Sequence, residues 1–144
     1  MDQLDAQIVS SLEQNARQTS DTIARQLNVS SATIRRRLKR LLDAKELHIE
    51  AYRDPSKAGL PVAALIGLNI DHELHEQVME EVRRLPEVSW ASTTTGRFDG
   101  FAFVRSPSTE RLYMFFRDVL LKITGIKDSE TFVCLHVEKG GRVG

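Results

Sequence analysis

Residues 30–42 read SSATIRRRLKRLL, and this stretch determines the first half of the fold. It opens with Ser30, a residue type that commonly caps helices, and it places Ile34, Leu38 and Leu41 at helical spacing. Its other positions include five cations, which are Arg35, Arg36, Arg37, Lys39 and Arg40. The predicted helix is therefore anchored along one narrow apolar stripe and is strongly positive elsewhere.

A shorter helix is predicted directly before this one. Residues 21–27, DTIARQL, are amphipathic, and Asn28-Val29 makes a tight connection to Ser30. Two helices joined by a turn, the second of them basic, are typical of a helix-turn-helix, whose second helix enters the major groove of DNA. A basic helix face can also be merely solvated. The preceding helix and turn favour double-stranded DNA as the partner.

A helical wheel assigns a role to each exposed position of the basic helix. We expect four residues to approach base edges: Ser31, Ala32, Thr33 and Arg36. We expect three cations to contact phosphates: Arg35, Lys39 and Arg40. Arg37 lies nearest the buried stripe, so we expect it to pair with a carboxylate of its own domain.

Composition indicates a globular protein of one or two domains. The 144 residues are 41% hydrophobic and 28% charged, with a net charge of zero. Residues 1–58 hold ten Lys/Arg and eight Asp/Glu, so the basic charge is concentrated in one helix. The single Cys134 is compatible with a reducing compartment. With no signal peptide and no apolar run of membrane-spanning length, we expect a cytoplasmic protein without a membrane partner.

The periodicities divide the chain into two domains. Leu4, Ile8 and Leu12 predict a first helix, and residues 47–53 alternate apolar with polar as a half-buried strand does. Residues 54–59, DPSKAG, then break regular structure. We expect a helix-turn-helix domain with a linker strand or wing over residues 1–58, and a second domain over 59–144.

The second domain alternates strands and helices. We predict strands at 62–70, 88–95, 101–105 and 131–138, and helices at 72–85 and 109–123. This β-α-β-β-α-β order is that of a ferredoxin-like α+β fold, with both helices on one face of an antiparallel sheet. The strands are apolar on both faces, which implies that the face opposite the helices is also buried against another surface. We expect a homodimer, with Cys134 facing the partner.

Four segments resemble the Lrp/AsnC transcriptional regulators. Residues 4–9 (LDAQIV) with 15–17 (NAR), 23–30 (IARQLNVS), 33–41 (TIRRRLKRL) and 95–101 (TGRFDGF) are similar to motifs of that family. The resemblance implies a plain or winged helix-turn-helix followed by an α/β effector domain, called a RAM domain. It also implies dimers that assemble into tetramers, octamers or larger rings, and an amino acid or related metabolite bound near residues 96–100.

The residues of this loop suit an amino-acid effector. Thr95 and Gly96 offer a hydroxyl and an unhindered backbone, Asp99 can accept from an α-ammonium group, and Arg97 can bind a carboxylate. Thr131 is a further candidate on the last strand. The same glycine and aspartate are also preferred in plain hairpin turns, so a purely structural loop is the alternative.

Two positions depart from the family pattern. Lys45 stands where many members have glycine after the second helix; a left-handed cap would strain a lysine by about 1 kcal/mol, so we expect the helix to end differently. Phe98 stands where tyrosine is frequent and lacks its hydroxyl.

We expect a regulator rather than an enzyme, with no cofactor and no metal. One alternative is an enzyme on the same architecture, because siroheme decarboxylases resemble this family in fold. The other alternative is a metabolite sensor that does not bind DNA.

Overall fold

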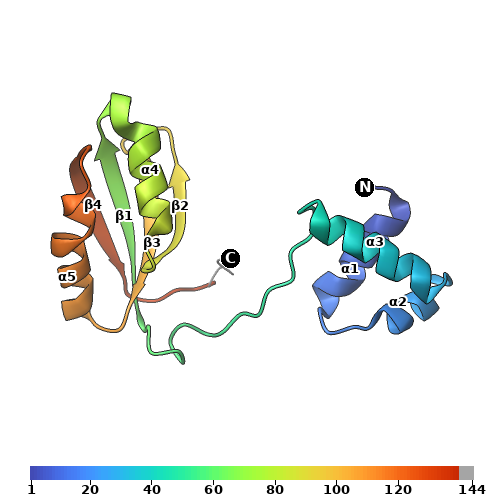
Figure 1. The fold of residues 1–144 in the computed structure, drawn as a ribbon. Coiled ribbons are helices and arrows are strands. Elements are labelled where there is room, and N and C mark those ends of the chain that lie inside the picture. Colours follow the sequence, from blue (N-terminus) through green and yellow to red (C-terminus); the bar gives the residue numbers. More distant parts are fainter. Residues whose placement is uncertain (140–144) are drawn as a thin grey trace. The chain divides into compact units, whose positions relative to one another are not determined.

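The computed structural model describes residues 1–139 of the chain. It consists of two compact units that divide between Ala51 and Tyr52 (Figure 1).

The N-terminal unit contains three helices, α1 (Gln3–Gln14), α2 (Ser20–Leu27) and α3 (Ser31–Asp43). Each helix follows a polar residue whose side chain accepts a hydrogen bond from an amide of the first turn; these residues are Asp2, Thr19 and Ser30. The core consists of Ile8, Leu12, Ile23, Ala24 and Ile34. The helix-turn-helix predicted from residues 21–42 is confirmed in α2 and α3.

Helix α3 ends in a left-handed turn at Lys45, whose φ is 58°. The Lys45 amide donates to the Leu42 carbonyl at 3.1 Å, and the Glu46 amide donates to the Leu41 carbonyl at 3.0 Å. This is the hydrogen-bond pattern of a Schellman motif, which usually has glycine at the left-handed position. The expectation that Lys45 avoids this conformation is wrong, because the two hydrogen bonds offset its strain.

Residues 47–53 form no strand, so the predicted wing is not found in this part of the chain. Leu47 is half-buried, and residues 48–53 are all exposed. A strand needs a neighbour to satisfy its backbone groups, and the four-stranded sheet of the described residues does not include this segment. The turn predicted at 54–59 is confirmed, with the Ala58 amide donating to the Asp54 carbonyl at 2.9 Å.

The second unit is an antiparallel sheet with the strand order β2-β3-β1-β4. The strands are β1 (Val62–Ile70), β2 (Val88–Thr93), β3 (Gly100–Ser106) and β4 (Ile126–Cys134). Helices α4 (His75–Arg84) and α5 (Thr109–Asp118) pack on one face (Figure 1). The shared core includes Ala64, Ile66, Leu68, Val78, Val82, Ala102, Val104, Leu112 and Phe115. The predicted β-α-β-β-α-β order is confirmed.

Several predicted boundaries differ from the structure; strand β2, for example, ends at Thr93 rather than at residue 95. Strand β4 covers 126–134 rather than 131–138. It is an edge strand that pairs with β1, with one shift in register near Asn69, and its polar residues 127–130 are tolerated at that edge. The first helix begins as a 3-10 turn, η1 (His72–Leu74), and the second gives way after Asp118 to another, η2 (Leu120–Lys122). Short 3-10 turns are frequent at helix ends.

The face of the sheet opposite the helices carries an apolar row that crosses all four strands. In the strand pairing Trp90 lies opposite Phe103, Phe103 opposite Leu65, and Leu65 opposite Phe132. Directly paired residues point to the same face, so these four side chains are neighbours. Trp90 is 45% exposed and Phe132 is 44% exposed. Cys134 lies on this same face, opposite Ala63.

Candidate DNA-binding surface and effector loop

Four of the five cations on α3 are paired with carboxylates of the N-terminal unit. Arg35 Nη1 lies 3.6 Å from Asp21 Oδ1, and Lys39 Nζ lies 2.5 Å from Asp43 Oδ2. Arg37 and Arg40 bind carboxylates at the start of α1. The fifth cation, Arg36, is exposed and makes no ion pair with any of residues 1–139. It can therefore bind a base edge without giving up an ion pair to this described part of the chain.

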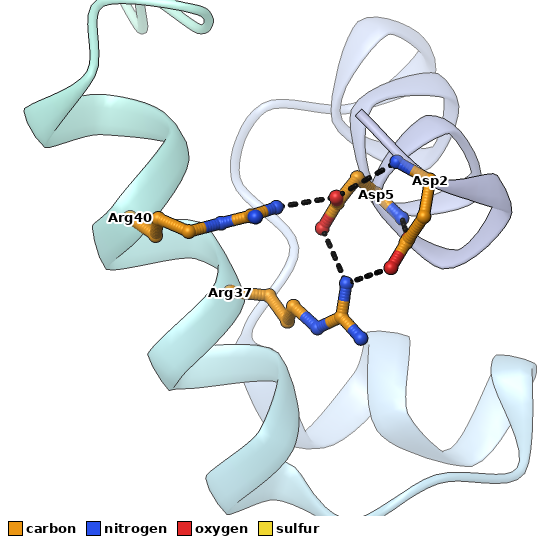
Figure 2. A network of polar contacts seen from close by, with 4 residues as sticks. All are labelled: Asp2, Asp5, Arg37 and Arg40. Carbon is orange, nitrogen blue, oxygen red and sulfur yellow. Dashed lines mark hydrogen bonds and ion pairs between the residues drawn. The ribbon is translucent and has the colours of Figure 1, made fainter.

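Two carboxylates at the start of α1, the N-cap Asp2 and Asp5 of the first turn, form a compact network with two arginines of α3 (Figure 2). Asp2 and Asp5 make a capping box, in which the Asp5 amide donates to Asp2 Oδ1 at 2.9 Å and the Asp2 amide donates to Asp5 Oδ2 at 3.0 Å. Arg37 Nη1 donates to Asp2 Oδ2 and, at 3.2 Å, to Asp5 Oδ1. Arg40 Nη2 donates to Asp5 Oδ2. The expected pairing of Arg37 within its own domain is confirmed.

The network keeps both carboxyl groups ionised. The Asp2 backbone amide, together with Arg40 and Arg37, holds the pKa of Asp5 well below its usual range, although burial of Asp5 acts in the opposite direction. The hydrogen bond from Arg37 likewise lowers the pKa of Asp2. Both partners of each ion pair therefore remain charged at neutral pH.

Arg40 was predicted to contact a phosphate, but in the structure its guanidinium group is bound to a carboxylate of the same unit. Its side chain is 54% exposed, but one end of the guanidinium group is bound to the fully buried Asp5. The wheel could not show this pairing, because it describes α3 alone and Asp5 belongs to α1.

The N-terminal turn of α3 holds the other predicted base-reading residues. Ala32 is exposed, and Ser31 and Thr33 are half-buried. The Thr33 amide donates to Ser30 Oγ at 3.2 Å, and the two hydroxyls lie 2.8 Å apart. The cap thus fixes the Thr33 side chain at the start of the helix.

The loop between β2 and β3 is fastened to the end of β1 through Asp99. Asp99 Oδ2 accepts from the Ile70 amide at 2.7 Å, and the Asp99 amide donates to the Leu68 carbonyl at 2.8 Å. The Asp99 carbonyl accepts from the Thr94 amide at 3.1 Å and lies 3.1 Å from His75 Nε2. Asp99 therefore has a structural role in the loop, as the structural alternative expects.

Phe98 places the loop over the sheet face that the helices leave uncovered. Its ring packs against Gly67 of β1 and meets Phe101 edge-on, with the ring centroids 5.3 Å apart. Phe98 is 8% exposed. Its burial shows that this position works as an apolar anchor and needs no hydroxyl.

Arg97 lies outside this anchor and is 80% exposed. Its guanidinium lies over the Phe98 ring, and its Nη2 is 3.4 Å from Glu130 Oε2 on β4. The loop thus presents one accessible arginine that already faces a carboxylate.

The remaining effector candidates are exposed. Thr95 and Gly96 are at the tip of the loop, where Gly96 has a φ of 103°. Thr131 lies opposite Ile66, and its side chain points to the helix-covered side of β4. The structure therefore groups Thr95, Gly96, Arg97 and Asp99 in one loop, with Thr131 on the other face of the sheet.

Sequence reasoning missed the acidic and small residues that support these groups. Asp2 and Asp5 form a capping-box pair before an apolar stripe, and an acidic residue at such a position can also bind a neighbouring helix. Gly67 lies inside a strand, which often signals the close approach of another group. No feature of the sequence predicts that Glu130 lies near Arg97, because the two residues belong to different elements that only the folded sheet brings together.

Among residues 1–139, no three His, Cys, Asp or Glu side chains are grouped to hold a metal ion. No helix in that range is both long and apolar enough to cross a membrane.

Comparison with known proteins identifies the class of protein. Residues 1–42 match the AsnC-type helix-turn-helix domain, and residues 63–143 match the Lrp/AsnC ligand binding domain. The chain is thus a transcriptional regulator with a DNA-binding helix-turn-helix and a ligand-binding type of domain. It belongs to the Lrp/AsnC family.

Relatives along the whole chain agree with this assignment. The HTH-type transcriptional regulator PF1231 of Pyrococcus furiosus is 34% identical over 98% of this chain and 96% of its own length. PH0140 of Pyrococcus horikoshii, also named as an HTH-type transcriptional regulator, is 32% identical over 98% of this chain and 90% of its own. Because these relatives are named as regulators, the enzymatic alternative is not favoured.

Two solved structures share the fold over nearly the whole chain. AsnC of E. coli has a TM-score of 0.87 and 26% identity, covering 98% of this chain and 96% of its own. NMB0573 of Neisseria meningitidis, solved as an L-Met complex, has a TM-score of 0.86 and 26% identity, covering 99% and 95%.

Proposed function

We propose that this regulator binds specific DNA sequences through α3 and that a small effector, an amino acid or a related metabolite, modulates its DNA affinity or assembly. The observation that carries the proposal is the exposed Arg36, which makes no ion pair with any of residues 1–139 and lies beside the capped first turn of α3. A regulator of this kind acts on the chromosome, so its proposed location is the cytoplasm. The proposed domain division is 1–58 and 59–144.

The proposed contacts follow the charge arrangement on α3. Arg36 donates two hydrogen bonds to a guanine, and Ser31, Ala32 and Thr33 approach neighbouring base edges. Arg35 and Lys39 contact phosphates, because their carboxylate partners are at the surface and a phosphate replaces them at little cost.

We further propose that the apolar row on the sheet is covered by a second copy of the chain. Trp90, Phe103, Leu65 and Phe132 form one continuous apolar row, and a symmetric dimer places such a patch against the same patch of the second copy. Placing this row against its own copy removes apolar area from water on both protomers. Dimers then offer two recognition helices to one operator and can assemble further into tetramers or octamers.

The proposed effector site is the outer side of the loop. Arg97 is its main ligand, because its guanidinium is exposed and can exchange Glu130 for the carboxylate of an amino acid. Thr95 and Gly96 offer further hydrogen bonds. Asp99 contributes through Oδ1, since its bond to the Ile70 amide uses Oδ2. Thr131 is a candidate from a neighbouring copy. The L-Met complex of the Neisseria meningitidis relative supports an amino-acid effector.

The experiment is a DNA titration of the full chain in the presence of each of the common amino acids, after a thermal-shift screen of the same panel. We expect one of them to change DNA affinity by about 5–150-fold, as is typical of coupled sites. Arg97→Ala should remove this response and leave basal DNA affinity unchanged. Arg111→Ala, which removes an exposed arginine from α5, is the matched control and should keep the response. A full response in Arg97→Ala would exclude the loop as the effector site.

A further inference from the structure

The cations of α3 differ in how firmly a carboxylate holds them. Lys39 pairs with Asp43 at the surface, where the two side chains are 77% and 64% exposed. Arg37 and Arg40 bind Asp5, whose side chain is 0% exposed. A surface pair is weak and opens readily for a phosphate. A buried carboxylate that loses its arginines is left charged and unpaired, which is far more costly.

The two oxygens of Asp5 are both engaged by arginine. Oδ1 binds Arg37, and Oδ2 binds Arg40 as well as the Asp2 amide (Figure 2). With Asp2, the network contains two carboxylates and two guanidinium groups, so it is neutral as a whole. DNA that approaches α3 therefore meets Arg35, Arg36 and Lys39 as available charges.

We propose that Asp5 limits the number of phosphates that α3 neutralises, because it withholds Arg40, and with Asp2 also Arg37, from the DNA. Each cation that reaches a phosphate releases a counterion and strengthens binding to any sequence. Specificity depends on the ratio of specific to nonspecific affinity. A carboxylate that keeps cations outside the base-reading turn away from the phosphates lowers nonspecific affinity. It therefore raises this ratio without itself contacting the DNA. This inference rests on the proposed contacts of α3.

The test measures the salt dependence of binding to a short duplex of arbitrary sequence, with the full chain. Asp5→Asn retains the size of the side chain and a hydrogen-bond partner for Asp2 but removes the charge that holds Arg40. We expect the slope of log affinity against log salt to steepen by about 0.9 for each recognition helix. Between about 50 and 200 mM salt, the affinity advantage of the variant over wild type then shrinks about 3.5-fold per helix.

Two controls separate this effect from a general change in charge. Asp43→Asn makes the same change in net charge, on α3 itself, but frees only Lys39, which is already exchangeable; its slope should match wild type. Arg40→Gln should leave the wild-type slope unchanged and should return the slope of Asp5→Asn to the wild-type value. A loosened fold would lower affinity for every duplex and would not produce this reversal.

Three results would overturn the inference. They are an unchanged slope in an Asp5→Asn variant with native circular dichroism, an equal steepening in Asp43→Asn, and a flatter slope in Arg40→Gln alone. If Asp5→Asn does not fold, Arg40→Gln decides, because an unchanged slope supports the inference and a flatter one contradicts it. A wild-type chain that binds no duplex at any salt concentration would contradict the proposed function and this inference with it.

Discussion

Gly67 of β1 lies directly against the ring of Phe98, where a Cβ on residue 67 would come within 2.7 Å of the ring carbons. This contact fixes the height of the loop above the sheet and so positions Arg97. The absence of a side chain at one strand position is therefore a condition for the geometry of the proposed effector site.

Gly67→Ala should destabilise the second unit by about 1–3 kcal/mol, because the added methyl group displaces a packed aromatic ring. Urea unfolding measures this change. In a Phe98→Ala background the same substitution should cost far less, since the ring that it meets is gone. Equal costs in the two backgrounds would show that the contact with Phe98 does not limit residue 67.

Phe132→Asp should convert the proposed dimer into a folded monomer, because it buries a charge in the apolar row. Light scattering measures the mass, and the emission of Trp90, the only tryptophan, should shift to the red as this face becomes hydrated. Val133→Asp is the matched control. Val133 is 50% exposed on the same strand but lies opposite Ala64, on the helix side. A dimer that survives Phe132→Asp would place the interface elsewhere.

Lys45→Gly should stabilise the N-terminal unit by about 1 kcal/mol, since glycine adopts the left-handed conformation without strain from a Cβ atom. Lys45→Ala removes the same charge but keeps the Cβ atom, so it should give no such gain. The measurement is the unfolding transition of the helical unit followed by circular dichroism. Equal stabilities of the glycine and alanine variants would contradict the account of this helix end.

The N-terminal unit should lose stability in acid through Asp5. Its pKa is lower in the folded state than in the unfolded chain, where it is about 3.9, so the folded protein binds fewer protons. The stabilisation is fully present above the unfolded-state pKa and is lost as pH falls below it. The difference in melting temperature between wild type and Asp5→Asn should therefore stay constant above about pH 5 and shrink as pH is lowered below about 4. Parallel curves would show that Asp5 titrates alike in both states.

Sequence patterns predicted the elements well where a local rule governs them. The cap at Ser30 follows from its residue type, and the apolar stripes of α2 and α3 follow from helical spacing. The predicted strand at 47–53 is absent. The alternation of apolar and polar residues describes a single strand, whereas a sheet also requires a neighbouring strand to pair with it. The prediction for the end of α3 was wrong, because the preference of lysine against a left-handed conformation is outweighed by two hydrogen bonds of the turn.

The candidate sites depend more strongly on contacts between distant segments. The role of Arg37 could be predicted, because the wheel places it beside the buried stripe. The pairing of Arg40 with Asp5 joins residues 35 positions apart, and Gly67 of β1 supports Phe98 of the loop between β2 and β3. Such contacts are fixed by tertiary packing, which no single helix or strand pattern contains.

Selection of bound sequences from a pool of random duplexes shows whether α3 reads DNA through Arg36, with wild type, Arg36→Ala and Lys39→Ala in parallel. We expect wild type to enrich a symmetric site with half-sites about 10 base pairs, or a multiple of this, apart. Arg36→Ala should lose discrimination at one base position of each half-site, by about 1–3 kcal/mol, whereas Lys39→Ala should keep the same motif with weaker binding throughout. Two results would contradict the assignment of α3 as the element that reads DNA through Arg36. One is a wild-type chain that binds the pool but enriches no motif, and the other is the same motif in wild type and Arg36→Ala.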